Sequence, residues 1–308
     1  MSRIRIGLVG VGKIARDQHL PVIAANPDYE LVAVASRHGR VDGVAHFYTL
    51  EGLLEGAGDL DAISLCTPPQ VRHALARQAL EAGKHVMLEK PPGATLSEVY
   101  DLIDLAREKG VALLATWHSR YAPAVEPAKA WLEGKKLRRV HVSWKEDVRH
   151  WHPGQEWIWE PGGLGVFDPG INALSIVTHI LPHALIVHAA TLEVPGNRQA
   201  PIAATLSMHD HRGLPVTAEF DWRQTGPQTW DIVVETDQGT LTLSRGGAVM
   251  SIDGVAQLEQ KEQEYANLYA LFAKLVAERK VDADLAPLRI VADAYLTGRW
   301  LRVEDFVE

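Results

Sequence analysis

The sequence contains a single cysteine, Cys66, among its 308 residues. One thiol cannot build an intrachain disulfide framework or a cysteine-rich zinc site, and such a composition suits the reducing cytosol. Long uncharged apolar runs are also missing. The apolar N-terminal stretch is interrupted by Lys13 and Arg16, which argues against a signal peptide and a membrane span. We therefore expect a cytoplasmic protein with no membrane partner.

An excess of positive charge is absent as well. The formal net charge is −8, and no basic stripe with interleaved aromatic residues occurs, so nucleic acid is not an expected partner. The chain is 46% hydrophobic and 23% charged, which is an ordinary globular composition. Its length suits two compact domains or one large one.

A glycine motif follows the first apolar segment of the chain. Residues 3–9 alternate as a strand does, and the sequence GVGKIA begins at Gly10. In this G-x-G-x-x-A pattern, Gly10 permits a tight turn and Gly12 lets the backbone approach a pyrophosphate. Small Ala15 allows the helix to pack closely on the strand, and the N-terminus of that helix favours phosphate. The pattern predicts a dinucleotide-binding turn.

The second predicted strand, Glu30–Ala35, ends in Ser36 and Arg37. Proteins selective for NAD usually carry an acid at this point to hold the ribose 2′-hydroxyl, whereas arginine suits a 2′-phosphate. Ser36 can donate a hydrogen bond to the same phosphate. We therefore predict that NADP is preferred, with NAD as the alternative cofactor; the other interpretation of Arg37 is a solvated loop residue.

Strands and helices alternate through the first 120 residues, which indicates a doubly wound parallel sheet. Further strands are predicted at Asp61–Cys66, Val86–Leu88 and Val111–Ala115, and helices at Thr49–Leu54, Gln70–Glu81 and Thr95–Lys109. Thr95 and Glu98 form a capping-box pattern, and Gly110 follows as a stop signal.

Lys90 occupies a conspicuous position in this alternation. The run Val86–Leu88 ends abruptly in Glu89 and Lys90, and two prolines then prevent the strand from continuing. Ligands of open α/β sheets bind just beyond the carboxyl ends of such strands. We therefore expect Lys90 at the mouth of a ligand crevice, although a lysine in a loop is often only solvated.

Short alternating segments dominate the second half and predict a mostly antiparallel sheet within an α+β domain. The predicted strands are Arg139–Lys145, Leu185–Val194, Ala203–His209, Val216–Trp222, Trp230–Thr236, Thr240–Ser244 and Val249–Ile252, and the predicted helices are Pro123–Leu132, Glu262–Glu278 and Pro287–Trp300. We place a dinucleotide-binding domain at 1–120 and a substrate-binding and oligomerisation domain at 121–308, with the last helix able to pack back on the first domain.

A long segment rich in tryptophan and glycine, residues 150–172, separates the first two of these strands. Its composition is typical of a binding loop, although single tryptophans more often pack in a core. His150 and His152 share a spacing with His209 and His211, but neither pair has an evident third ligand. We interpret all four as loop histidines and predict no metal.

Three features together resemble the glucose-fructose oxidoreductase / inositol dehydrogenase family: the glycine turn, the sequence EKP at 89–91 and the sequence GGLGVFDPGIN at 162–172. The resemblance covers essentially the whole chain. It implies a Rossmann domain followed by an α+β domain with a large open sheet, and a homo-oligomer, dimer or tetramer, formed through that sheet. The residues 67–69 and His73 resemble the family's segment near the nicotinamide. The resemblance implies cofactor contacts at Gly10, Gly12, Lys13, Ile14, Ser36, Arg37, Cys66, Thr67, Pro68, His73, Glu89 and Lys90.

The segments 89–95, 115–120 and 157–163 look most similar to the family's aldose 1-dehydrogenases. This implies oxidation of the C1 hydroxyl of a pyranose such as L-arabinose, D-galactose or D-fucose to the lactone. The alternatives are a non-catalytic NADP-binding sugar sensor or repressor, which the retention of Lys90 and Asp168 disfavours, and an inositol-type polyol dehydrogenase. The implied substrate-binding residues are His118, Glu146, Trp151, Asp168, Asn172 and Trp230.

One departure from the family concerns Asn172, where most members carry a histidine assigned to acid/base chemistry. Asparagine does not exchange a proton near neutral pH, so the general base must be Asp168, Lys90 or His118. Asp168 is our first choice, with Lys90 stabilising charge on O1 and Asn172 orienting the hydroxyl. Because Asp168 precedes Pro169, it also fits a helix N-cap, and the Asp168→Asn variant separates the two roles.

Overall fold

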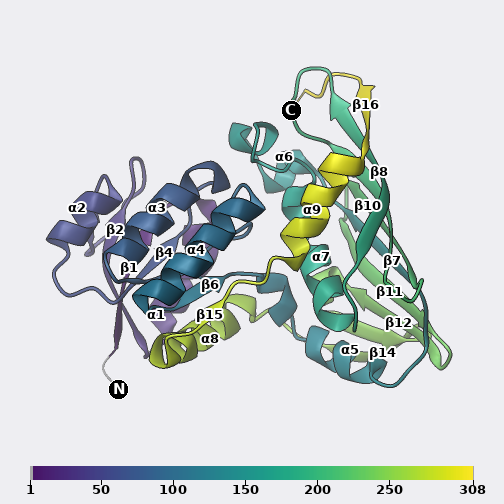
Figure 1. The fold of residues 1–308 in the computed structure, drawn as a ribbon, viewed down its shortest axis with the longest axis horizontal. Coiled ribbons are helices and arrows are strands. Elements are labelled where there is room, and N and C mark those ends of the chain that lie inside the picture. The colour runs from purple at the N-terminus through teal and green to yellow at the C-terminus, as the bar shows by residue number, and fades with distance from the viewer. Residues whose placement is uncertain (1–2, 308) are drawn as a thin grey trace. The chain divides into compact units, whose positions relative to one another are not determined.

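The structure is a computed structural model that describes residues 3–307, and the chain forms two compact units (Figure 1). The first unit runs through Trp117 and also contains Tyr265–Asp284. The second consists of His118–Glu264 and the chain from Leu285 onward. The expected single division after residue 120 is therefore corrected, because a segment of the second half of the sequence returns to the first unit.

The first unit holds a parallel sheet with helices between its strands. Its strands are β1 (Ile4–Val9), β2 (Tyr29–Ala35), β3 (Ala45–Phe47), β4 (Ala62–Leu65), β5 (His85–Leu88), β6 (Leu113–Ala115) and β15 (Val281–Asp282). Its helical segments are the π-helical turn η1 (Ala15–His19), α1 (Leu20–Ala25), α2 (Leu50–Gly56), α3 (Pro69–Glu81), α4 (Leu96–Lys109) and α8 (Glu264–Glu278), apart from the first residue of α8.

The strand order β15-β6-β5-β4-β1-β2-β3 confirms the doubly wound sheet, and every strand pair in it is parallel. The order reverses at β1, which is the switch point where such folds bind ligands. The ends of β1, β4 and β5 are in register, with Val9 opposite Leu65 and Leu65 opposite Leu88. The residues that follow these three strands therefore meet at one edge of the sheet.

Local signals for helix ends are confirmed in α4. The Thr95 hydroxyl accepts a hydrogen bond from the Glu98 N–H, and the Glu98 carboxylate accepts one from the Thr95 N–H, which completes the capping box. Gly110 adopts a left-handed conformation at the C-terminus, with φ of 63°.

Helix α8 belongs to the first unit because its apolar face is buried there. The Tyr29 hydroxyl donates to the backbone carbonyl of Tyr269, and the rings of these two residues meet edge to face. Strand β15 then pairs with β6. The sequence pattern predicts α8 correctly but does not say against which sheet the helix packs.

The second unit contains a nine-stranded sheet whose order is β14-β13-β12-β11-β7-β10-β9-β8-β16. Its strands are β7 (Leu137–Lys145), β8 (Ile186–Pro195), β9 (Ala203–His209), β10 (Pro215–Asp221), β11 (Thr229–Thr236), β12 (Gly239–Ser244), β13 (Val249–Ile252), β14 (Val255–Glu259) and β16 (Arg299–Val303). Its helices are η2 (His118–Tyr121), α5 (Val125–Leu132), α6 (Val148–Trp151), η3 (Glu156–Trp159), α7 (Phe167–Ile180), η4 (Arg245–Gly247) and α9 (Ala286–Thr297).

Most pairs of this sheet are antiparallel, as predicted, but β10 pairs with β7 and β16 with β8 in parallel. Alternate residues of the central strands are buried, and Val140, Val142 and Trp144 lie opposite Val216, Ala218 and Phe220. Helices cover this apolar face (Figure 1). The opposite face carries polar pairs such as Lys145 and Glu219, so the sheet has one apolar and one polar side.

Helix α7 lies very close to the sheet. A Cβ at Gly170 would come within 2.9 Å of the Phe220 ring, so this position requires glycine. Phe167 packs on the same ring with centroids 5.6 Å apart. The close approach buries the first turn of α7.

The last predicted helix, Pro287–Trp300, is a correction. Helix α9 ends at Thr297, and Arg299–Val303 pairs with β8 as an edge strand. Helix α9 also belongs to the second unit, so it is not the helix that returns to the first. The strands β3, β14 and β16 were not predicted because short edge strands carry little alternation. No helix within residues 3–307 is both long and apolar enough to cross a membrane.

Candidate active site

The glycine turn after β1 forms the core of the candidate cofactor site. Gly10 has a φ of +92°, and a Cβ there would lie 3.0 Å from the Cys66 backbone, so only glycine fits. A Cβ at Gly12 would meet nothing within 4 Å, so the backbone there faces open space. Ile14 begins the following helix, and Lys13 forms an ion pair with Asp17 one turn on.

Ser36 ties the end of β2 to this turn. Its hydroxyl oxygen accepts hydrogen bonds from the backbone N–H groups of Val11 at 3.4 Å and Gly39 at 3.1 Å. Arg37 follows with an exposed side chain. Serine and arginine thus stand beside the turn at the place where an adenosine 2′-substituent would be recognised.

The loop after β4 offers a buried polar atom for a ligand. Thr67 Oγ1 is buried and has no hydrogen-bond partner among residues 3–307, and its methyl group lies near Gly10. An unsatisfied buried hydroxyl costs free energy unless a bound group pairs with it. The residues around the turn therefore fit a dinucleotide, and a contact of Thr67 with it stays a prediction.

Arg72 fixes the two loops that follow β4 and β5. Its guanidinium is buried in α3 and donates to the carbonyl oxygens of Thr67, Glu89 and Pro91. A charged fork that binds three carbonyls cannot be replaced by lysine. Sequence analysis missed this residue, because no local pattern signals a buried arginine.

Lys90 lies directly after β5, as predicted, and its backbone is held by its neighbour. The Lys90 N–H donates to Glu89 Oε2 at 3.0 Å. Glu89 is 4% exposed, and its other oxygen accepts hydrogen bonds from His19 at 2.9 Å and from the Tyr265 hydroxyl at 2.8 Å. The carboxylate of Glu89 therefore anchors the backbone of Lys90 to a buried network.

His19 is the centre of that network. Its Nδ1 lies 2.8 Å from the Tyr269 hydroxyl and 3.3 Å from Ser64 Oγ, while Nε2 contacts Glu89. Burial alone lowers the pKa of His19, but Cys66, Tyr269 and Glu89 around it raise the pKa well above its usual value. The raised pKa favours an ion pair between the His19 imidazole and the Glu89 carboxylate, which lie 2.9 Å apart.

His73, predicted near the nicotinamide, is held within α3 and α4. Its Nε2 lies 2.8 Å from the Asp101 carboxylate, which also binds Arg77. The hydrogen bonds from His73 and Arg77 lower the pKa of Asp101. A role of His73 at the cofactor stays a prediction.

In the second unit, Asp168 lies in the first turn of α7 and is 2% exposed. The helix begins at Phe167 with Val166 as N-cap and no capping side chain, so the N-cap interpretation of Asp168 is wrong. Asn172 follows one turn later on the same face. Asp168 therefore lies within the helix and not at its N-cap position.

The glycines before α7 serve the fold rather than a ligand. A Cβ at Gly163 would lie 2.0 Å from the Trp157 carbonyl, and one at Gly165 would lie 2.4 Å from the Pro201 carbonyl. These two glycines therefore allow close contact with neighbouring backbone in the same unit, directly before the helix that carries Asp168.

Asp168 belongs to a buried polar cluster with Glu146 and His152. His152 Nε2 lies 3.6 Å from Asp168 Oδ2 and 3.8 Å from Glu146 Oε1. Glu146 follows β7, is 3% exposed, and accepts a 2.9 Å hydrogen bond from the Trp230 indole N–H. His152 lies in the loop after α6, as interpreted, and the fold brings it between two carboxylates.

Aromatic rings surround Glu146. Trp151 lies 5.1 Å from Trp230, and Trp144 stacks on Trp230 at 5.8 Å. Trp151 and Trp230 thus come together, and their role in holding a sugar ring stays a prediction. Apolar ring faces beside a carboxylate suit the C–H face and hydroxyls of a carbohydrate.

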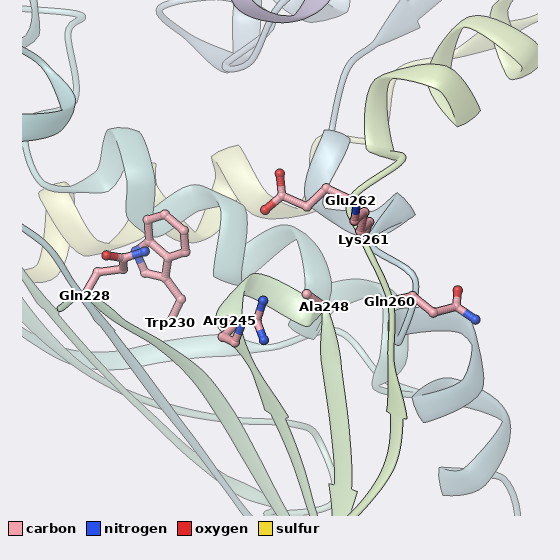
Figure 2. A pocket seen from close by; sticks show the side chains of 7 residues that line it. All are labelled: Gln228, Trp230, Arg245, Ala248, Gln260, Lys261 and Glu262. Atoms are coloured by element: carbon pink, nitrogen blue, oxygen red, sulfur yellow. The ribbon is translucent and has the colours of Figure 1, made fainter.

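A hollow of about 330 Å³ opens beside Trp230 (Figure 2). It is lined by Gln228, Trp230, Arg245, Ala248, Gln260, Lys261 and Glu262. The Glu262 carboxylate points toward the side of Trp230, while Gln260 points away. Burial raises the pKa of Glu262, with a further contribution from Glu264. Trp230 therefore joins this hollow to the polar cluster.

His118 lies in η2, and its Nδ1 is hydrogen-bonded to the Glu264 carboxylate. Both side chains are nearly buried, at 16% and 14% exposure. The carboxylate fixes the orientation of the imidazole, as it does for many functional histidines. Within residues 3–307, no three His, Cys, Asp or Glu side chains are arranged to hold a metal ion.

Comparison with known proteins places this chain among relatives of similar length. It is 51% identical over 308 residues to a galactose 1-dehydrogenase of Pseudomonas fluorescens, covering 100% of both proteins. The crystal structure of a D-galactose-1-dehydrogenase protein from Rhizobium etli matches with a TM-score of 0.95 and 60% identity, over 100% of this chain and 99% of that one.

A 3-ketoreductase from Actinomadura kijaniata, solved with NADP and TDP-benzene, matches with a TM-score of 0.85 over 98% of this chain and 100% of that one. Its identity is 21%, so this likeness concerns the fold alone. The profile of the GFO/IDH/MocA oxidoreductase family, with its NAD-binding Rossmann fold, matches residues 4–116. From the full-length similarity and this match, the chain belongs to the GFO/IDH/MocA family, as its motifs predict.

Proposed function

We propose that this protein is an aldose 1-dehydrogenase that oxidises the C1 hydroxyl of a pyranose to the lactone, with NADP preferred over NAD. The observation that carries the proposal is the Asp168 carboxylate, which is buried in the first turn of α7 without a capping role. The two galactose 1-dehydrogenases, similar over their full length, support the reaction class.

The first unit would hold the dinucleotide. Gly10 and Gly12 leave room for the pyrophosphate, and Thr67 Oγ1 offers an unpaired hydrogen-bonding group. Ser36 and Arg37 support NADP because a guanidinium pairs with a phosphate in a charge-assisted way. Bound nicotinamide would supply the acceptor for the C1 hydride.

Two side chains would handle the C1 hydroxyl. Asp168 would accept its proton, and the Lys90 ammonium would stabilise the negative charge that develops on O1. Asn172, one turn after Asp168, would orient the hydroxyl. His118 remains the alternative base, because Glu264 orients its imidazole.

D-galactose is the substrate we put first, because both similar dehydrogenases are named for it. L-arabinose and D-fucose share the ring configuration and differ at the exocyclic carbon. Trp151 and Trp230 would lie against the ring, and Glu146 would accept hydrogen bonds from its hydroxyls. A pocket that recognises the shared ring accepts all three sugars.

The test is to incubate the protein with each member of a panel of aldoses and inositols, once with NADP and once with NAD. Turnover is measured from the absorbance of the reduced nicotinamide. We expect turnover with D-galactose, L-arabinose and D-fucose, and higher kcat/KM with NADP. Turnover of inositols alone would contradict the proposal in favour of a polyol dehydrogenase. NADP binding without turnover of any sugar would favour the sensor.

We also propose that the polar face of the nine-stranded sheet mediates a homo-oligomer. Light scattering of the eluting peak in size-exclusion chromatography measures this directly. A monomer at micromolar concentration would contradict it.

A further inference from the structure

His152 lies at the centre of a polar cluster that three separate elements assemble. It follows α6, and its backbone N–H donates to the Val148 carbonyl at 2.8 Å. Glu146 comes from the end of β7 and Asp168 from the first turn of α7. The two carboxylates are each 3% exposed, and the imidazole is 16% exposed.

The carboxylates on either side of His152 are themselves fixed. The Glu146 backbone N–H donates to the Asp221 carbonyl at 2.9 Å, and its Oε2 accepts the Trp230 indole N–H. Asp168 is held by α7, whose first turn is packed on Phe220. The His152 ring packs on Trp222 with centroids 5.4 Å apart. The Glu146 and Asp168 carboxylates are therefore held in place on either side of the His152 imidazole.

A buried carboxylate that takes a proton needs a group that can remove it again. Asn172, the position where the family motif carries histidine, cannot do this, because an amide does not exchange protons near neutral pH. His152 supplies an imidazole 3.6 Å from Asp168 although it lies 16 positions before it in the sequence. A separate element of the fold thus places an imidazole near Asp168.

We propose that His152 acts on the reaction through Asp168: it receives the substrate proton that the Asp168 carboxylate has taken up. This rests on the proposed function, in which Asp168 is the base. The Asp168 carboxylate takes the O1 proton as C1 loses its hydride, and the C1–O1 bond becomes a carbonyl. The proton then passes from Asp168 to His152 Nε2, which restores the carboxylate. The imidazolium so formed lies between two carboxylates and releases its proton to solvent.

Glu146 has a distinct part in this arrangement. The Glu146 carboxylate lies 3.8 Å from His152 Nε2, where its negative charge attracts the proton that His152 receives from Asp168. The same carboxylate binds Trp230, so it couples the aromatic wall of the site to the proton path. No oxidant or metal is needed for this step, because only a proton moves.

The test uses the full-length enzyme with the best substrate of the panel. In His152→Gln, the amide can still donate a hydrogen bond to the carboxylates but cannot take up a proton. In His152→Ala, the loss of a ring that is 16% exposed leaves a cavity that imidazole added to the solution can enter. We expect kcat to fall roughly a hundredfold in both variants, the lower part of the usual range for acid/base groups, with KM little changed.

Imidazole in the buffer should restore kcat of His152→Ala and leave His152→Gln unchanged. His150→Gln is the matched control: this histidine is exposed and lies two residues away, so kcat of the variant should match the wild type. NADPH binding, followed by fluorescence, and Tm are compared with the wild type to establish that each variant is folded.

Two results would overturn the inference. Wild-type kcat in His152→Gln would show that proton uptake at this position is not needed. A loss of kcat in His152→Ala that imidazole does not restore would assign His152 a purely structural role. If the wild type instead binds NADP but oxidises no aldose, the proposed function fails. That result differs from an active wild type whose His152 variants keep full kcat, which would contradict only the role of His152.

Discussion

The buried network around Glu89 predicts a specific effect of Tyr265→Phe. This change removes only a hydroxyl, which donates at 2.8 Å to a carboxylate that is 4% exposed. A hydrogen bond to a charged group is worth ~1.5–3 kcal/mol. With an unfolding entropy of about 2.1 cal/mol/K per residue, we expect the Tm of this 308-residue chain to fall by roughly 2–5 °C.

Tyr29→Phe is the matched control. Tyr29 and Tyr265 are 3% and 4% exposed, and the Tyr29 hydroxyl donates at 2.7 Å to a neutral acceptor, the Tyr269 carbonyl. A neutral hydrogen bond contributes ~0.5–1.5 kcal/mol, so the difference between the two variants is about 1–2 kcal/mol. Circular dichroism melts on both variants and the wild type measure it.

The Tyr265→Phe and Tyr29→Phe variants also distinguish an effect on stability from an effect on kcat. The Glu89 carboxylate also accepts the Lys90 N–H, so its loosening in Tyr265→Phe should displace Lys90 and lower kcat. Tyr29→Phe should leave kcat unchanged. Equal loss of Tm in the two variants would refute a charged Glu89, and unchanged kcat in Tyr265→Phe would refute its role in holding Lys90.

Four further predictions concern charged groups. Arg37→Asp should weaken NADP much more than NAD, because repulsion replaces a charge-assisted contact; equal effects in cofactor titrations would contradict the assignment. Lys90→Met should lower kcat by roughly a hundredfold or more and leave NADPH binding nearly unchanged; normal turnover would make Lys90 a solvated loop residue. Asp168→Asn should fold with near-normal Tm and lose a factor of roughly 10²–10⁴ in kcat, whereas an active variant would transfer the base's role to His118. The folded-state pKa of His19 is raised, so its contribution to stability is complete below ~6.5 and is lost as pH rises through the folded pKa. As pH rises above ~6.5, the Tm of the wild type should therefore fall more than the Tm of His19→Gln. Parallel pH profiles of Tm for the two proteins would contradict an ion pair between His19 and Glu89.

Local patterns in the sequence determine much of the first unit. Alternating runs predict its main strands, and the Thr95 capping box and Gly110 predict the ends of α4. The glycine turn is also a local feature, since φ of +92° at Gly10 is a property of single residues. Lys90 could be placed because Pro91 ends its strand and parallel strands present their carboxyl ends to ligands. All these signals act over a few residues.

Only the tertiary structure decides which distant groups meet. Asp168 followed by Pro169 reads as an N-cap, yet close packing of Gly170 on Phe220 starts the helix earlier and buries the carboxylate. Helix α8 is predictable, but its return to the first unit depends on Tyr265 and Tyr269 reaching residues more than 170 positions away. No sequence pattern around His152 predicts that it lies near Glu146 and Asp168. Its place between Glu146 and Asp168 arises because β7, α6 and α7 converge, and convergence depends on packing across elements that no short window of sequence contains.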